Sequence, residues 1–464
     1  MLTRPNTFID DTLHTSTKSM MTILRKSKTS LFLVTFVGAL TIIVGILCGL
    51  QTHPVRRRAE VPMLVVEKIE DDSSPQSLFA RRGCVKKVHI FGSDREMRHI
   101  PELKEYMDIF RKSNLPLNAA GIDCVSEGYD CDIVLTMGGN VDYLEGKDAV
   151  VFGLVPTEFR GEGREQFKKL LELRPATGQT WIYFSTEPPL RVLRWTRDLD
   201  LMRLKYHVLM TYDLDSEIVV PFGYYRPFHT TGVHASSNQT LETAHFQDPL
   251  LGKEGMIAWM ASNCKAFWPR TEFISQMRDV LPLDDYGKCG RKECLPIRSD
   301  ECNKLMARYK FYFAIPNSEC KDYITEKFWL QSLSAGTVPV VVGSRKESYQ
   351  AVAPPNSYIH FSDFKSIDEL VDYLNRLDKD DEAYRRFYDW RSQGEVVLTY
   401  PTRPTIFCKA LPHLHEKRDV KPYKYLGDSP WFKGCRMTPD RRVFDLSKQE
   451  QKTLSKFENW SVWR

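Results

Sequence analysis

A stretch that could bind an anionic ligand lies within residues 309–343. Thr325 has the side chain of a helix N-cap, and Glu326 and Lys327 would follow it in the first helical turn. A helix N-terminus presents free N–H groups and a positive dipole end, which suit phosphate. Lys327 would add a full charge, and Glu326 could accept hydrogen bonds from ribose hydroxyls. The spacing also fits an ordinary βαβ unit with a surface Glu-Lys pair.

A second candidate for chemistry is Glu187. It follows the apolar run 181–185 and precedes Pro188 and Pro189. In open α/β folds the carboxyl ends of strands carry ligand chemistry. A residue before proline is kept out of the helical region, so the glutamate would sit on a stiff turn. A lone glutamate at such a place is more often a solvated loop residue.

The elements expected around the first candidate are strand, loop, helix and strand. Residues 309–315 are aromatic and apolar, as in a buried strand, and Pro316 with Asn317 breaks the run. A helix from Thr325 would end near Gly336. The β-branched run 338–342 suits a parallel strand. The pattern therefore predicts a βαβ unit.

The rest of the chain alternates in the same way, which predicts an α/β fold with two domains. Strands are expected at 86–91, 132–137, 149–155 and 256–263, and helices at 102–112, 165–173, from Arg270 and at 367–390. The predicted organisation is an N-terminal domain at 84–240, a C-terminal domain at 250–395 and a C-terminal tail at 396–464, with a linker at 229–252.

The motif Asp322-Tyr323-Ile324-Thr325-Glu326-Lys327, with Val338-Pro339-Val340-Val341 after it, closely resembles the donor-binding motif of α1,3-fucosyltransferases. The resemblance spans about 181–391 and includes the strand before Glu187, where the family has an aromatic strand followed by Glu-Ser-Pro. One departure is Ile315-Pro316 before Asn317, where the family usually has a glutamate next to the asparagine. Pro316 has no backbone N–H and a fixed φ, so the loop that follows the strand at 309–315 is expected to differ in shape from that of the family.

The resemblance implies a GT-B-like fold, with two facing Rossmann-like domains, and inverting transfer of L-fucose from GDP-β-L-fucose. It implies that Glu187 is the general base. It assigns donor binding to Arg270, Asn317, Tyr323, Glu326 and Lys327.

The implied reaction needs no metal or other cofactor, because Arg270 and Lys327 can stabilise the charge on the departing GDP. A divalent cation could stimulate it without being essential. Asp213-Leu214-Asp215 spells a DxD motif, but it falls inside the family's own non-metal pattern and is not assigned as a ligand pair.

The acceptor is expected to be a hydroxyl, O3 of GlcNAc, on a glycoprotein or glycolipid glycan. The residues do not distinguish a lactosamine antenna, the N-glycan core GlcNAc or a protein hydroxyl. Two alternatives stay open: another nucleotide-sugar transferase of the same fold, and an inactive lumenal protein that binds a sugar nucleotide. The Ile315-Pro316 departure favours inactivity. The argument against it is the joint presence of Glu187, Arg270, Glu326 and Lys327.

Residues 31–50 form an uncharged apolar run long enough to cross a bilayer as a helix. We expect a signal-anchor at 31–50, a cytoplasmic tail at 1–30 and a flexible stem at 51–83. A buried core helix and a cleaved signal peptide are the alternatives. A buried core helix seldom lacks a polar face, as this run does. A cleaved signal peptide usually has a shorter apolar run that lies nearer the N-terminus.

Cysteines favour an oxidising compartment. Of eleven, Cys48 lies in the apolar run, and the remaining even number permits full pairing in disulfides. The first domain holds an odd number, Cys84, Cys124 and Cys131, so one is predicted to pair outside it. Zinc is the rival reading for the cluster of Cys289, Cys294 and Cys302, but no CxxC pair is present there.

Sequons at Asn238 and Asn459 also fit a lumenal side. The combined expectation is a single-pass type II protein of the Golgi membrane with its catalytic part in the lumen. The net charge of +5 is small for 464 residues and no long basic tract is present, so a nucleic-acid partner is not expected.

Overall fold

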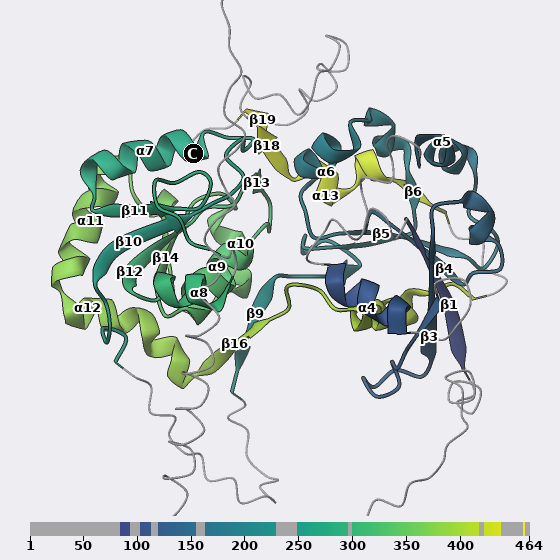
Figure 1. The fold of residues 1–464 in the computed structure, drawn as a ribbon, viewed down its shortest axis with the longest axis horizontal. Helices are drawn as coiled ribbons and strands as arrows, with labels where there is room; N and C mark the ends of the chain where they lie inside the picture. The colour runs from purple at the N-terminus through teal and green to yellow at the C-terminus, as the bar shows by residue number, and fades with distance from the viewer. Residues whose placement is uncertain are drawn as a thin grey trace, which may run out of the picture. The chain divides into compact units, whose positions relative to one another are not determined.

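The computed structural model describes residues 84–92, 103–112, 119–154, 163–228, 248–295, 299–416, 422–437 and 458–459 (Figure 1). All of them fall within one unit of the chain, Asp72–Arg464. The predicted anchor at 31–50, with the tail before it and the stem after it, lies outside the described residues, as does Asn238. No helix in the described part is both long and apolar enough to cross a membrane.

A seven-stranded sheet in the order β2-β3-β1-β4-β5-β7-β8 forms the first domain. Its neighbouring strands are parallel except β2 and β3. Strands β4, β5 and β7 consist entirely of buried residues, as expected for parallel strands covered on both faces. The strands are β1 Val85–Phe91, β2 Ala119–Ile122, β3 Asp132–Gly138, β4 Ala149–Phe152, β5 Thr180–Ser185, β7 Val208–Thr211 and β8 Ile218–Val219. Its helices include α4 Lys104–Lys112, α5 Arg164–Glu172 and α6 Pro189–Thr196.

A five-stranded parallel sheet in the order β11-β10-β12-β14-β15 forms the second domain. Alternate residues of β12 point to opposite faces: Phe311 and Phe313 join one core, Tyr312 and Ala314 the other. Helices α7, α11 and α12 pack on the first face and α8, α9 and α10 on the second (Figure 1). The strands are β10 Gly255–Met260, β11 Leu283–Tyr286, β12 Tyr309–Ala314, β14 Val338–Val341 and β15 Ile359–His360. The helices are α7 Arg270–Val280, α8 Asp300–Met306, α9 Glu326–Phe328, α10 Lys346–Val352, α11 Ile367–Lys379 and α12 Asp381–Arg385.

The strands predicted in both domains are confirmed, whereas two helix predictions are wrong in detail. The helix expected over 367–390 is three elements: α11, α12 and a 3₁₀ segment, Arg386–Ser392. It breaks because Asp380 leaves the helical region and caps α12 by accepting from the Ala383 N–H. The helix after Thr325 is α-helical only over α9 and continues as a π-helix, Trp329–Ser334. The Ser332 hydroxyl there donates to the Lys327 carbonyl at 2.6 Å.

The chain after the second sheet returns to the first domain. Strand β16, Gly394–Leu398, pairs with β9, Gly223–Pro227. A 3₁₀ helix, Pro404–His413, then buries Phe407 and Ala410 in the core of the first sheet. Further short elements follow in the tail: β17 Lys424–Tyr425, α13 Pro430–Lys433, β18 Cys435–Met437 and β19 Glu458–Asn459. The sequence alone does not predict where these residues pack.

Ten cysteines form five disulfides in the described part of the chain. The predicted bridge out of the first domain is confirmed: Cys84 pairs with Cys131, and Cys124 pairs with Cys408 of the tail. The cysteines considered for zinc are paired instead. The remaining pairs are Cys264–Cys289, Cys294–Cys302 and Cys320–Cys435.

Candidate active site

Glu187 lies on a tight turn between β5 and α6. The Ser185 hydroxyl donates to the Glu187 carbonyl at 2.8 Å and accepts from the Glu187 N–H at 3.2 Å. Pro188 is extended and Pro189 begins α6, where a proline loses no hydrogen bond. The turn places the glutamate at the carboxyl edge of the first sheet, as the sequence predicts.

The Glu187 carboxylate is held by residues of the second domain. The Tyr323 hydroxyl donates to Glu187 Oε2 at 3.0 Å, and the Asn317 side chain also hydrogen-bonds the carboxylate. Burial raises the pKa of Glu187, while the positive charge of Arg191 and the two hydrogen bonds oppose that rise. Glu326 raises the pKa further through charge repulsion. The carboxyl group is therefore poised to take a proton more readily than an exposed glutamate.

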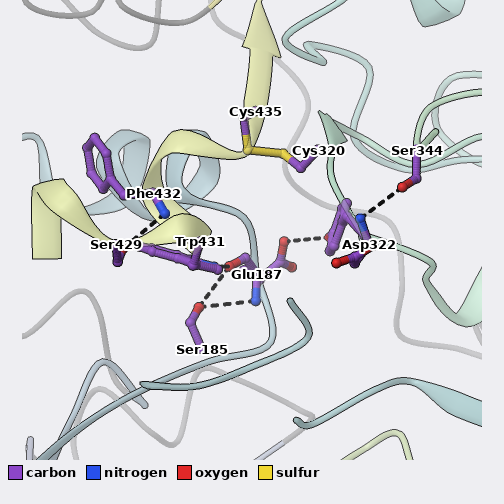
Figure 2. The surroundings of a disulfide bond; sticks show 10 residues. Ser185, Glu187, Cys320, Asp322, Ser344, Ser429, Trp431, Phe432 and Cys435 are labelled. Atoms are coloured by element: carbon purple, nitrogen blue, oxygen red, sulfur yellow. Dashed lines mark hydrogen bonds between the residues drawn. A yellow bond between two sulfur atoms is a disulfide. The ribbon is translucent and has the colours of Figure 1, made fainter. Parts of the chain in front are cut away.

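Tyr323 is held in place by packing of its ring and by hydrogen bonds of the preceding residue, Asp322. Its ring packs against Tyr212 at 4.7 Å between centroids. Asp322, just before it, has a positive φ of 59°. The Asp322 N–H donates to Ser344 Oγ at 2.9 Å, and its carboxylate accepts from the Leu214 N–H at 3.1 Å. These bonds hold a backbone conformation that an aspartate seldom adopts, and so they direct the tyrosine toward Glu187. Figure 2 shows the hydrogen bond between Asp322 and Ser344.

The predicted N-cap is confirmed, because Thr325 Oγ1 accepts from the Lys327 N–H at 3.4 Å. The Lys327 ammonium donates to Glu326 Oε1 at 2.5 Å. Both side chains are largely buried, with exposed fractions of 15% and 18%. They form an ion pair at the cavity wall, from which either could turn to a phosphate or a ribose hydroxyl.

Arg270 begins α7 and is only 1% exposed. Its guanidinium donates from Nη1 to the Ile315 carbonyl at 3.0 Å and from Nη2 to the Asn263 carbonyl at 2.6 Å. Burial lowers its pKa to about 10, so the group remains a cation at neutral pH. Nε has no hydrogen-bond partner among the described residues. Arg270 therefore brings positive charge to the site while fixing two backbone segments.

The Ile315-Pro316 departure is accommodated by packing. Ile315 is fully buried in the core of the second sheet. The Pro316 carbonyl accepts from the Trp268 indole N–H at 3.1 Å. Gly343 lies against the proline ring, where a Cβ would come within 2.9 Å of Pro316 Cγ. The glycine at the end of β14 thus leaves the room that the proline occupies.

A cavity of about 530 Å³ lies at this site. It brings together every predicted catalytic and donor-binding side chain: Glu187, Arg270, Asn317, Tyr323, Glu326 and Lys327. Other lining residues were not predicted as site residues; they include Arg191, Phe222, Lys288, Gln331 and Tyr400. Arg191 lies on the turn of α6 that follows Glu187, and its guanidinium stacks on Trp195 at 4.6 Å. The sequence signal for it was a cation spaced four positions after the candidate base.

The aspartates of the DxD motif lie close to Lys321, the residue just before the motif that begins at Asp322. Lys321 Nζ lies 3.8 Å from Asp213 and forms ion pairs with Asp215 and Asp322. In the part of the chain that the structure describes, no cluster of three or more His, Cys, Asp or Glu side chains could hold a metal ion. Of the predicted sequons, Asn459 lies in β19, Glu458–Asn459, next to β18.

The comparison with known proteins identifies the family. A profile described as "Glycosyltransferase family 10 (fucosyltransferase) C-term" matches residues 250–429. Alpha-(1,3)-fucosyltransferase 7 of Bos taurus is 33% identical over 277 residues, which cover 59% of this chain and 72% of that protein. The chain belongs to the family 10 fucosyltransferases. The resemblance inferred from the motifs is confirmed.

Other members of the fucosyltransferase family match over smaller parts of their length. Glycoprotein 3-alpha-L-fucosyltransferase A of Drosophila melanogaster is 35% identical over 226 residues, 48% of this chain and 42% of that protein. Alpha-(1,3)-fucosyltransferase 4 of Bos taurus is 34% identical over 250 residues, 53% of this chain and 58% of that protein. The family profile includes Arg270 and Lys327 but not Glu187, which precedes the matched residues.

Solved fucosyltransferase structures are also similar. The structure titled "Crystal Structure of alpha1,3-Fucosyltransferase" is 17% identical, with a TM-score of 0.41, and the match covers 67% of this chain and 83% of that one. The structure with GDP-fucose is 17% identical, with a TM-score of 0.36, and the match covers 71% of this chain and 90% of that one.

Proposed function

We propose that this protein transfers L-fucose from GDP-β-L-fucose to a hydroxyl group, O3 of GlcNAc on a glycoprotein or glycolipid glycan, with inversion at the anomeric carbon. One observation carries the proposal. The Glu187 carboxylate accepts from Tyr323 at 3.0 Å inside a cavity that Lys327 and Arg270 also line. A carboxylate, a nearby ion pair and a buried cation are the groups that such a transfer needs.

In the proposed mechanism the Glu187 carboxylate removes the proton of the acceptor hydroxyl. The acceptor oxygen forms a bond to the anomeric carbon while the bond from that carbon to the GDP oxygen breaks on the opposite face. A single displacement of this kind inverts the configuration and requires no covalent nucleophile. General-base catalysis is most effective when the pKa of the base is tuned by its surroundings, as it is for Glu187.

The departing GDP gains negative charge as its bond to fucose breaks. Lys327 and Arg270 are fixed by the ion pair with Glu326 and by backbone carbonyls, so little reorganisation accompanies the reaction. We assign the ribose contact to Glu326 and further donor contacts to Asn317 and Tyr323. We also propose that the two α/β domains face each other, as in GT-B enzymes.

The proposed base can be tested by Glu187→Gln in the full chain. The amide keeps the size of the side chain but cannot accept the proton, so turnover of GDP-fucose should fall by about 10²–10⁴-fold. GDP affinity, measured by calorimetry, should change little because the cations that bind the diphosphate remain.

Glu165→Gln, at an exposed position of α5, is the matched control and should turn over like the wild type. A folded Glu187→Gln protein with wild-type turnover would exclude the proposed base. A wild-type protein that binds GDP-fucose and never transfers fucose to any glycan or glycopeptide would instead indicate the inactive sugar-nucleotide-binding alternative.

We also propose that the protein is a single-pass type II protein of the Golgi membrane, anchored by residues 31–50, with the catalytic domains in the lumen. The uncharged run of membrane-spanning length and the five disulfides of the described residues support this placement.

In sealed microsomes the catalytic domains should resist added protease. Glycosidase treatment should increase electrophoretic mobility, and Asn238→Gln should reduce that shift. Digestion of the catalytic domains without detergent would contradict the proposed topology.

A further inference from the structure

The tail residue Trp431 contacts the backbone of the proposed base. Its indole N–H donates to the Glu187 carbonyl at 3.2 Å. Its ring, 1% exposed, packs on Tyr183 of β5 at 4.9 Å between centroids. The Ser185 hydroxyl donates to the same carbonyl, so two donors fix the peptide that carries the base. Figure 2 shows Trp431 beside Glu187.

The turn that carries Trp431 is itself well fixed. Ser429 caps α13, because its hydroxyl accepts from the Phe432 N–H at 3.1 Å and donates to the Leu426 carbonyl at 2.7 Å. Phe432 is buried in the same core as Tyr183. Trp431 is therefore held in place independently of its bond to Glu187, as a positioning group must be.

The other end of this segment is joined to the donor motif. Cys435 forms a disulfide with Cys320, and β18 pairs antiparallel with β13, Glu319–Cys320. The Lys321 N–H donates to the Gly434 carbonyl at 2.8 Å. Tyr323, which donates to the Glu187 carboxylate, lies two positions after Lys321. Figure 2 shows this disulfide in the same view as Glu187 and Trp431.

The contacts close a ring around Glu187. Its carboxylate is held by Tyr323, and its carbonyl is held by Trp431. The segments bearing these two residues are linked covalently through Cys320–Cys435. Since each connecting segment is short, displacement of the tail would move both groups that orient the base.

We propose that Trp431 is a positioning residue for the general base and that the Cys320–Cys435 disulfide maintains its position. This inference rests on the proposed function of Glu187. Lys327 and Arg270, the cations assigned to the diphosphate, lie outside the ring, whereas Tyr323 lies within it. Loss of the tail contacts should therefore lower the rate of transfer much more than the affinity for GDP.

The test is Trp431→Phe in the full chain, which keeps an aromatic ring against Tyr183 but removes the N–H. Turnover should fall about threefold to tenfold, the effect of losing one neutral hydrogen bond. The dissociation constant for GDP should stay at the wild-type value. In a Glu187→Gln background, Trp431→Phe should cause no further loss, because no base remains to be oriented.

A second variant tests the disulfide and does not depend on the tryptophan. Cys320→Ser with Cys435→Ser should lower turnover much more than it lowers GDP affinity. The matched control, Cys84→Ser with Cys131→Ser, removes a disulfide at the amino ends of β1 and β3, the edge of the sheet opposite Glu187. The control should keep wild-type turnover.

The outcomes separate this inference from the proposed function. If Glu187→Gln abolishes turnover but Trp431→Phe and the Cys320, Cys435 variant match the wild type, the positioning role is wrong and the base stands. If these tail variants lost turnover and GDP affinity to the same extent, the tail would have only a general structural role. Wild-type turnover in Glu187→Gln would overturn the base assignment itself.

Discussion

The protonation state of Glu187 is controlled by the residues around it. Burial raises its pKa, and Glu326 adds to the rise, whereas Arg191, Tyr323 and Asn317 stabilise the ionised form. The pKa of the Tyr323 hydroxyl is raised well above its ordinary value by burial and by Glu187, so it keeps its proton and can donate it in the hydrogen bond. These groups favour the ionised carboxylate and limit the rise that burial causes in the pKa of Glu187.

Arg191 provides a test of this balance through the pH dependence of turnover. A general base must be ionised, so activity should be lost as the pH falls through the pKa of Glu187. Arg191→Gln removes a positive charge that lowers the pKa of Glu187, so this pKa should rise further. The acid limb of the profile of kcat/KM against pH should therefore move to higher pH.

Lys288→Gln is the control, because Lys288 also lines the cavity but does not contribute to the pKa shift of Glu187. Its acid limb should coincide with that of the wild type. An unchanged acid limb in Arg191→Gln would show that this arginine does not tune the base.

At the scale of elements, the start of the helix after Thr325 forms the wall of the cavity that we propose binds the donor. Thr325 caps the first turn, and the transition to a π-helix at Trp329 coincides with the Ser332 bond to the Lys327 carbonyl. π-Helical turns are uncommon and frequently occur at functional sites. This segment fixes Lys327 and Glu326 at the wall of the cavity.

Lys327→Ala should weaken GDP binding by roughly tenfold to a hundredfold, since a hydrogen bond to a charged group contributes about 1.5–3 kcal/mol. Calorimetric titration with GDP measures the effect. The matched control is Lys346→Ala at the start of α10, whose ammonium pairs with Asp363 outside the cavity. If Lys327→Ala and Lys346→Ala bound GDP with equal affinity, the assignment of Lys327 to the donor site would be wrong.

Arg270 calls for a different substitution from Lys327. Its guanidinium carries charge and also binds two backbone carbonyls, so removal of the side chain would leave buried acceptors without partners. A change in GDP affinity in an alanine variant would combine both effects. Lysine, which keeps the charge and loses the forked geometry, is the more informative replacement.

At the scale of the whole molecule, the C-terminal segment connects the two domains. After α12 the chain returns through β16 and packs Phe407 into the core of the first sheet. Cys408 is bonded to Cys124 of the first domain, and Cys435 to Cys320 of the second. The tail is therefore part of the packing of both domains, and it reaches the base through Trp431.

The helices and strands around the site, and the side chains that could react, can be predicted from the sequence alone. The aromatic run of β12, the cap at Thr325 and the stop at Gly336 follow from short-range rules of strand composition, capping and left-handed backbone. The motif around Lys327 identified the family, and the odd number of cysteines in the first domain required a bridge leaving it. These signals are readable because they depend on neighbours along the chain.

The contacts between the site residues depend on the tertiary structure. Glu187 and Tyr323 are 136 positions apart, and Glu187 and Trp431 are 244 positions apart. No periodicity or turn rule relates residues at such separations, since their contact depends on how the buried aromatic side chains of separate elements pack. The same reason explains the missed role of Arg191, whose proximity to the base matters only because α6 turns it toward the cavity. The chemistry was present in the residue types, whereas its geometry arose from the packing of the tail and the two sheets.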